Sequence, residues 1–212
     1  MKTLLIFVFA FLIFTSCVDK KEMLFNGENL DGWTIFVNDS IISPTVLFYV
    51  NDGMIETVGV PVGYLRTIKE YSDYKLHIEW RYPEEPTNSG IFVHTNGTDV
   101  IWPGHYQGQL KHGNAGDFIV HGVGMSATLK DTVFTSTADK KPLISKFNPS
   151  NEKPAGEWNS FDITCEGSTI EFRINGLLQN TATNCSVTKG GIGLQAEGSK
   201  IQFRNLWIEQ LN

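Results

Sequence analysis

Side chains able to bind or transfer protons recur at alternating positions of several short apolar segments. Residues two apart on a strand point to the same face of a sheet. A carboxylate and a guanidinium on an open face could hold a polyhydroxylated ligand by charge-assisted hydrogen bonds, and a carboxylate could also move a proton. The alternative is a solvated face whose ion pairs contribute little to stability. The positions are Glu79 and Arg81, His94, Gln107 and Gln109, and Gln195 and Glu197.

Glycine separates several of these polar side chains from one another. Gly193 shares its parity with Gln195 and Glu197, whereas Leu194 and Ala196 take the opposite face. A solvent-exposed sheet face usually carries Lys, Glu and Thr, and glycine in a strand often marks the close approach of a ligand. We therefore expect these residues to line a groove. His94, which shares its parity with Gly90 and Phe92, is expected in the same groove.

Asp117 and two tryptophans add candidates outside these strands. Asp117 follows the turn 113–116 and could act as a base or bind sugar hydroxyls; alternatively, it closes an Asx turn. Trp102 precedes Pro103 in an expected loop, where its ring could stack on a sugar. Trp158 stands at the start of an expected strand, and we expect it in the core.

Several classes of function are disfavoured. The formal net charge is −6 without a basic cluster, which argues against a nucleic-acid partner. His105, His112 and His121 lack the spacing of metal ligands, so no metal site and no cofactor are expected. A structural Ca²⁺ stays open, because oxygen ligands scattered over loops leave no spacing signature. The sequence also lacks a phosphate loop and a serine nucleophile motif.

Short strands separated by turns must position these residues. Residues 74–82 alternate, with Leu76, Ile78 and Trp80 on one side. Asn175–Gly176 is a strong hairpin signal. These patterns predict an all-β fold of two packed antiparallel sheets, and we expect the polar residues 130–154 to form a long surface loop. Further strands are expected at 91–94, 118–120, 160–164, 169–174 and 200–208.

The N-terminus is typical of an exported lipoprotein. Lys2 precedes an apolar run from Leu4 to Phe14, which is too short to span a bilayer and leads into Thr15–Ser16–Cys17. We therefore predict a signal peptide (1–16), a lipidated Cys17 with a short linker (17–22) and one domain (23–212). The lipid would hold the domain at the outer membrane of the cell envelope, on its periplasmic face or at the cell surface. An ordinary cleaved signal peptide is the alternative.

Two cysteines remain in the predicted domain. An exported compartment is oxidising, so Cys165 and Cys185 could form a disulfide. Two separate buried thiols are the alternative.

Six phrases in order resemble the 3-keto-disaccharide hydrolase domain family and span essentially the whole predicted domain. They are Leu24–Trp33, Gly63–Thr67, Tyr71–Arg81, Asn88–Phe92, Gln109–Leu110 with Gly116–Phe118, and Gly156–Asn159 through Gln195–Gly198 to Phe203–Asn205.

The resemblance implies a concanavalin A-like jelly-roll sandwich that acts on sugars oxidised at C3. It points to Glu79, Arg81, Asp117, Gln195 and Glu197 as groove positions, and we add Arg66 as a substrate contact.

The expected chemistry is elimination followed by hydration. Glu197 or Asp117 would be the base, Arg81 or His94 would stabilise the enolate, and Glu79 would be the acid.

Two positions depart from the family pattern. Gln107 stands where members often carry Glu, and His94 stands where Arg is common. An amide cannot act as a general acid or base, so a carbohydrate-binding lipoprotein without activity is the main alternative. A conventional glycosidase and a purely structural lipoprotein are weaker alternatives.

Overall fold

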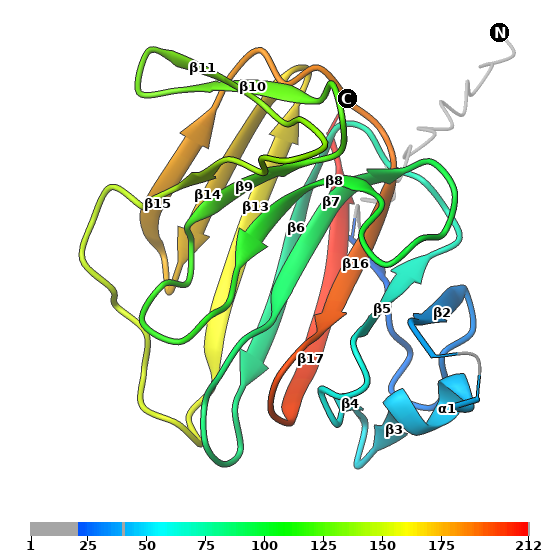
Figure 1. Cartoon of the computed structure of the whole chain (residues 1–212). Coiled ribbons are helices and arrows are strands. Elements are labelled where there is room, and N and C mark those ends of the chain that lie inside the picture. Colours follow the sequence, from blue (N-terminus) through cyan, green and yellow to red (C-terminus); the bar gives the residue numbers. More distant parts are fainter. Residues whose placement is uncertain (1–20, 40, 212) are drawn as a thin grey trace, which may run out of the picture.

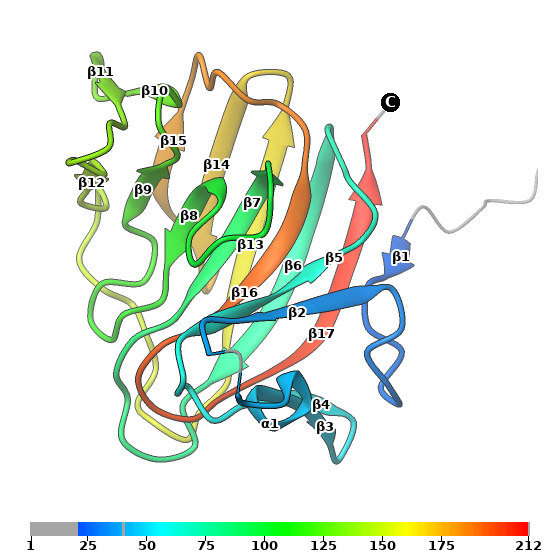
Figure 2. The ribbon, with the colours of Figure 1, turned by 45° about the vertical axis from the view of Figure 1, so that its right-hand side comes forward.

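The computed structural model describes residues 21–39 and 41–211. Within them, antiparallel strands form two large sheets that pack face to face (Figures 1 and 2). The predicted all-β jelly-roll sandwich is therefore confirmed. In this part of the chain no helix has the length and apolar character needed to cross a bilayer. The predicted signal peptide and Cys17 lie outside the described residues.

The first sheet, called the back sheet, has the order β15–β14–β13–β6–β17–β4–β3, and β1 pairs with β17. Within the described residues it holds eight strands. They are β1 (Lys21–Met23), β3 (Phe48–Asn51), β4 (Met54–Thr57), β6 (Tyr74–Arg81), β13 (Asn159–Glu166), β14 (Thr169–Ile174), β15 (Leu177–Ala182) and β17 (Ile201–Gln210).

The second sheet, called the groove sheet, has the order β12–β9–β8–β7–β16–β5–β2. Its strands are β2 (Trp33–Val37), β5 (Gly63–Thr67), β7 (Gly90–Asn96), β8 (Gly104–Gln109), β9 (Phe118–His121), β12 (Leu143–Ile144) and β16 (Gly191–Ala196). The hairpin of β10 (Ser126–Leu129) and β11 (Thr132–Thr135) and the short helix α1 (Pro44–Leu47) lie outside both sheets.

The core lies between the two sheets and follows the alternation of each strand. Ile78 and Trp80 of β6 face Phe161 of β13 inside the sandwich, with the Trp80 and Phe161 rings 6.3 Å apart. Phe118 of the groove sheet stacks on Phe172 of the back sheet at 4.9 Å. The first contact packs two neighbouring strands of the back sheet, and the second joins the two sheets. Truncating one of these buried rings to alanine costs about 3–5 kcal/mol.

The segment 130–154 differs from the predicted structureless loop. It contains β11, and its residues 143–144 add β12 as an edge strand beside β9 of the groove sheet. The side chain of Glu152, 5% exposed, accepts hydrogen bonds from the backbone N–H groups of Gly113 and Ala115. The polar composition of the segment predicts a loop, because local periodicity does not encode its packing against a sheet edge.

The predicted disulfide is wrong in this structure. Cys165 and Cys185 are free thiols, and both are buried. Cys165 lies on β13, and Cys185 lies in the connection from β15 to β16. Burial raises the pKa of the Cys165 thiol and raises that of Cys185 to about 12, so both stay protonated.

Candidate functional site

Polar side chains line up across the outer face of the groove sheet. Gly90 on β7 pairs with Gln109 on β8, and Gly193 on β16 pairs with Phe92 on β7, which pairs with Gln107 on β8. The residues between them in sequence, such as Leu194, face the core. Two glycines and two glutamines therefore meet on one face, because three neighbouring strands keep a common parity there.

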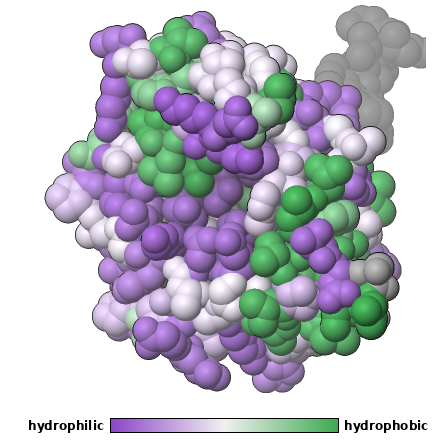
Figure 3. Space-filling view, in the orientation of Figure 1, coloured by the Kyte–Doolittle hydropathy of each residue, from purple (hydrophilic) through white to green (hydrophobic). Residues whose placement is uncertain are grey.

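A hollow of about 310 Å³ opens on this face. Hydrophilic surface covers much of the middle of the view in Figure 3, between apolar areas at the upper left and the right. The hollow, called the groove, brings together five of the predicted site residues, although their contact with a ligand stays a prediction. The groove is lined by Asn88, Trp102, Gln107, Gln109, Ile119, His121, Lys141, Leu143, Gln195 and Glu197.

Hydrogen bonds connect the amides of the groove to its carboxylate. Gln107 Nε2 donates to Gln195 Oε1 at 3.0 Å, and Gln195 Nε2 donates to Glu197 Oε2 at 2.7 Å. Gln109 Oε1 accepts from the backbone N–H groups of Leu110 and Lys111 at 3.0 and 3.1 Å. The floor is therefore a connected amide network in which Glu197 is the final acceptor.

An aromatic wall closes one side of this face. The edge of Trp102 meets the ring of Phe92 with centroids 6.1 Å apart, and Phe92 stacks on His105 at 3.8 Å. His105 in turn stacks on His121 at 4.9 Å. Aromatic rings beside amides are a common means of binding a sugar, since rings stack on its apolar face while amides bond its hydroxyls.

The two histidines of this wall are held neutral. Burial, with the neighbouring His121, lowers the pKa of His105 to about 3. Burial, with the positive charge of Lys141, lowers the pKa of His121 to about 4. His105 Nδ1 donates to the carbonyl of Pro103 at 2.7 Å, which fixes the tautomer of that ring.

Arg66 does not line the groove. Its guanidinium makes two hydrogen bonds to Asp99, at 2.8 and 3.0 Å, and Tyr64 also donates to Asp99 at 2.8 Å. The hydrogen bonds from Arg66 lower the pKa of Asp99. Asp99 belongs to the connection between β7 and β8 that carries Trp102. Arg66 therefore anchors the loop that presents Trp102, in place of the predicted substrate contact.

Glu79 and Arg81 were predicted in the groove, and this prediction is wrong. Both lie on β6 of the back sheet, and their side chains point outward, away from the core and from the groove sheet. Glu79 accepts from Arg204 at 2.6 Å and from Asn205 at 3.3 Å, and these bonds lower its pKa although burial raises it. Strand parity is correct here, but it does not tell to which of the two sheets a strand belongs.

Trp158 was expected in the core, and it lies instead on the same outer face of the back sheet. The guanidinium groups of Arg81 and Arg204 lie 4.6 and 4.0 Å from its ring centroid. Two cations therefore cover a ring that the sequence pattern assigned to the interior.

His94 was also predicted in the groove, and it faces the interior instead. Its backbone takes φ 52°, and the pairing of β7 shifts on both sides at this point. The irregularity turns the ring inward, where it meets the edges of Tyr74 and Tyr106 at 5.9 and 6.4 Å. Burial lowers its pKa, so the imidazole is a neutral core group.

Asp117 is buried outside the groove. Its Oδ1 accepts from the backbone N–H of Lys146 at 2.9 Å, and Asn114 Nδ2 donates to its Oδ2 at 3.3 Å. It is 2% exposed and does not line the groove. The alternative stated for it, a carboxylate that closes a local turn, fits this arrangement better than a groove base.

Five lining residues were not predicted as site residues: Asn88, Ile119, His121, Lys141 and Leu143. His121 had a signal, because it has the parity opposite to the core residues Phe118 and Val120. Lys141 and Leu143 carried none, since they reach the groove through β12, whose pairing with β9 is nonlocal.

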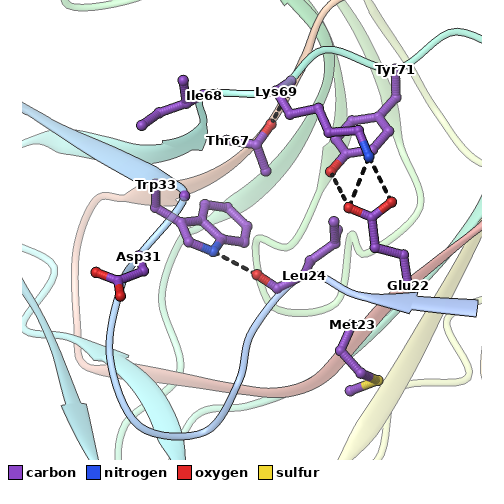
Figure 4. A pocket seen from close by; sticks show the side chains of 10 residues that line it. Glu22, Met23, Leu24, Asp31, Trp33, Thr67, Ile68, Lys69 and Tyr71 are labelled. Carbon is purple, nitrogen blue, oxygen red and sulfur yellow. Dashed lines mark hydrogen bonds and ion pairs between the residues drawn. The ribbon is translucent and has the colours of Figure 1, made fainter.

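A second hollow of about 400 Å³ lies near β1, and its polar groups pair with one another (Figure 4). Lys69 Nζ bonds Glu22 at 2.7 and 2.9 Å, and the Trp33 indole donates to the Leu24 carbonyl at 2.7 Å. In the described part of the chain, no three His, Cys, Asp or Glu side chains gather as a metal site would require. The groove is therefore the better candidate site.

Solved structures with a similar fold include proteins related to carbohydrates. A proposed glycosyl hydrolase from Parabacteroides distasonis ATCC 8503 is 22% identical, with 91% of this chain and 94% of that chain covered and a TM-score of 0.66. The carbohydrate-binding module CBM66 from Bacillus subtilis is 11% identical, with 84% and 96% covered and a TM-score of 0.60. For the Bacillus licheniformis β-glucanase the values are 12%, 90%, 96% and 0.56.

No curated protein matches the chain. The model of one family, the 3-keto-alpha-glucoside-1,2-lyase-like domain, matches residues 20–209. That range contains every lining residue of the groove and confirms the resemblance noted from the sequence. The chain belongs to the 3-keto-alpha-glucoside-1,2-lyase-like domain family.

Proposed function

We propose that this protein cleaves the glycosidic bond of 3-keto-glycosides by elimination followed by hydration. The observation that carries the proposal is the chemistry of the groove, where Glu197 is the only carboxylate among the described lining residues. Direct hydrolysis of an unoxidised glycoside ordinarily needs two carboxylates across the scissile bond. Elimination from a keto sugar needs one base and donors for the developing oxyanion.

The groove residues suit the steps of such an elimination. A ketone at C3 acidifies the C2 hydrogen, and Glu197 would accept that proton while the charge moves to the C3 oxygen. Gln109 has its oxygen engaged by backbone N–H groups, which leaves its NH₂ to donate to this oxyanion. The positive charge of Lys141 in the same groove would also favour it.

The enolate then collapses and expels the substituent at C1. The C3 carbonyl re-forms, a C1–C2 double bond forms, and the C1–O bond breaks. The departing oxygen takes a proton from water in the open groove, and the hydroxide that remains recovers the proton that Glu197 accepted, which regenerates the carboxylate. Water then adds across the new double bond, with its oxygen at C1 and a proton at C2, and yields the free 3-keto sugar.

The testing experiment compares a 3-keto-glucoside that carries a chromogenic aglycone with the unoxidised glucoside. Release from the keto sugar alone supports elimination, and release from the plain glucoside alone overturns it in favour of an ordinary glycosidase. With either substrate, the neutral His121 and Trp102 would contact the sugar ring.

A second candidate function is carbohydrate binding without cleavage. The amide at Gln107, where a carboxylate would carry acid–base chemistry, favours it, as does the similarity of the fold to a carbohydrate-binding module. No release from either glucoside, together with saturable glycan binding in calorimetry, would establish this function.

We also propose that the protein is an exported lipoprotein, anchored through Cys17 at the outer membrane of the cell envelope. The apolar run Leu4–Phe14 followed by Thr15, Ser16 and Cys17 supports this. One acyl chain binds a membrane only marginally, so stable anchoring requires more than one. Incorporation of labelled fatty acid that is lost in Cys17→Ser is expected, and equal labelling of that variant would overturn the anchor.

A further inference from the structure

Two amides of the groove floor donate in sequence toward Glu197, and the first of them, Gln107 Nε2, also lies 3.4 Å from Gln109 Oε1. Gln107 Nε2 donates to Gln195 Oε1 at 3.0 Å, and Gln195 Nε2 donates to Glu197 Oε2 at 2.7 Å. All of this takes place in a floor from which water is nearly excluded, since Gln107 is 6% and Gln195 4% exposed. Two buried amides therefore form a relay that ends at the candidate base.

Gly90 makes this relay possible. It lies on β7, the strand between those of Gln195 and Gln107. A Cβ at this position would collide with the amide nitrogen of Gln107 and lie 2.8 Å from Gln195 Oε1. The absence of a side chain at Gly90 thus lets two amides meet across the intervening strand. Any residue with a Cβ would stand between them.

The direction of the relay is set at Gln107. As long as Gln107 donates to the Gln195 oxygen, the Gln195 amide must turn its NH₂ toward Glu197. An amide turned the other way would place its oxygen against the carboxylate and leave the Gln107 hydrogens without this acceptor. A glutamate at 107 would accept only, and would draw the Gln195 NH₂ away from Glu197.

We propose that Gln107 is a positioning residue that orients Gln195 so that its amide holds the Glu197 carboxylate in the groove. The inference rests on the proposed role of Glu197 as the base. The amide at 107 then has a task of its own, and its presence does not mark a lost catalytic acid. Gly90 is the second requirement of the same device.

The activity test uses Gln107→Met, which keeps the size of the side chain and removes its donors. We expect kcat on the 3-keto-glucoside to fall about tenfold, the effect of one hydrogen bond, with KM changed less than threefold. Gln107→Glu is expected to lose at least as much. In the Glu197→Gln background, Gln107→Met should cause no further loss, because the relay acts through Glu197.

Gln202→Met is the matched control. Gln202 is also 6% exposed and donates to a buried carboxylate, Glu56, at 2.6 Å, but on the back sheet. It should lower thermal stability and leave kcat unchanged. Equal loss of kcat in Gln107→Met and in this control, or full additivity with Glu197→Gln, would overturn the inference.

A spectroscopic test separates this inference from the proposed function. Side-chain amide resonances of Gln107 and Gln195 are assigned in the full chain by their loss in single variants. Gln107→Met and Gly90→Ala should each shift the Gln195 NH₂ resonances and speed their hydrogen exchange, whether or not the protein has activity. Unchanged Gln195 resonances in both variants would sink the relay, while absence of turnover with a responsive Gln195 would sink the proposed function alone.

Discussion

The imidazole rings of His105 and His121 lie parallel, with centroids 4.9 Å apart and 5° between their planes. They come from neighbouring strands, β8 and β9, and pair directly in register. Burial lowers the pKa of both imidazoles, and the neighbouring His121 lowers that of His105 further, while Lys141 lowers that of His121. The two rings of the aromatic wall should therefore make the stability of the fold depend on pH.

The free energy of unfolding should fall as the pH drops below about 6.5. His105 and His121 have folded-state pKa values near 3 and 4 against 6.5 in the unfolded chain, so the unfolded chain binds protons that the folded chain does not. Each imidazole then removes about 1.4 kcal/mol per pH unit, for His121 until about pH 4. Urea unfolding at roughly pH 7.5, 6.0 and 5.0 measures how the free energy of unfolding changes with pH.

His121→Phe tests the origin of this slope. The variant keeps a stacked ring and should remove one imidazole's share of the pH dependence between pH 6.5 and 5. The lowered pKa of His94 contributes in the same direction and stays in both proteins. Carboxylates such as Glu56, with a pKa of about 2, act only below about pH 4.5. An unchanged slope in the variant would contradict the assignment.

Glu197→Gln should lower turnover of the 3-keto-glucoside by about 10³-fold, roughly the loss of a general base, while glycan binding is retained. Glu79→Gln is the control, because Glu79 lies on the outer face of the back sheet and pairs with Arg204. That variant should keep full activity. A comparable loss of activity in Glu79→Gln would instead place the chemistry on the back sheet and contradict the groove as the active site.

Breaking the pair of Arg66 and Asp99 should weaken substrate binding. The pair ties the connection between β7 and β8 that carries Trp102, so Arg66→Met frees the loop. We expect KM to rise about three- to tenfold, on the order of 1 kcal/mol for one bidentate pair, with kcat nearly unchanged. Arg173→Met, which breaks the pair with Glu171 on the back sheet, should alter neither constant. Equal effects of both variants would refute a specific role for the loop.

Both thiols of the described region should be unreactive in the native protein. Cys165 and Cys185 are buried, and burial raises the pKa of each thiol, so little thiolate forms at neutral pH. Iodoacetamide is expected to modify them only after unfolding, as read by intact mass. An intact mass lower than that of the reduced protein by two hydrogen atoms, and restored by reductant, would instead reveal the disulfide that the sequence suggested.

Local patterns in the sequence were sufficient for the architecture and for part of the site. The alternation in residues 74–82 correctly predicts Leu76, Ile78 and Trp80 as core, and the same rule places Gln195 and Glu197 outward. The ordered phrases led to the right family. These features are local, since strand parity and turn chemistry depend on neighbours in the chain.

Sheet membership and register required the tertiary structure. The alternation along β6 correctly indicates that Glu79 points away from the core, as the groove residues do. However, β6 pairs with β13 and β17 in the back sheet, so Glu79 lies on the opposite side of the sandwich. His94 turns inward because the pairing of β7 is irregular on both sides, and Lys141 reaches the groove only through the pairing of β12 with β9. Parity is set by each strand alone, whereas the choice of partner strands is made by the packing of the whole sandwich.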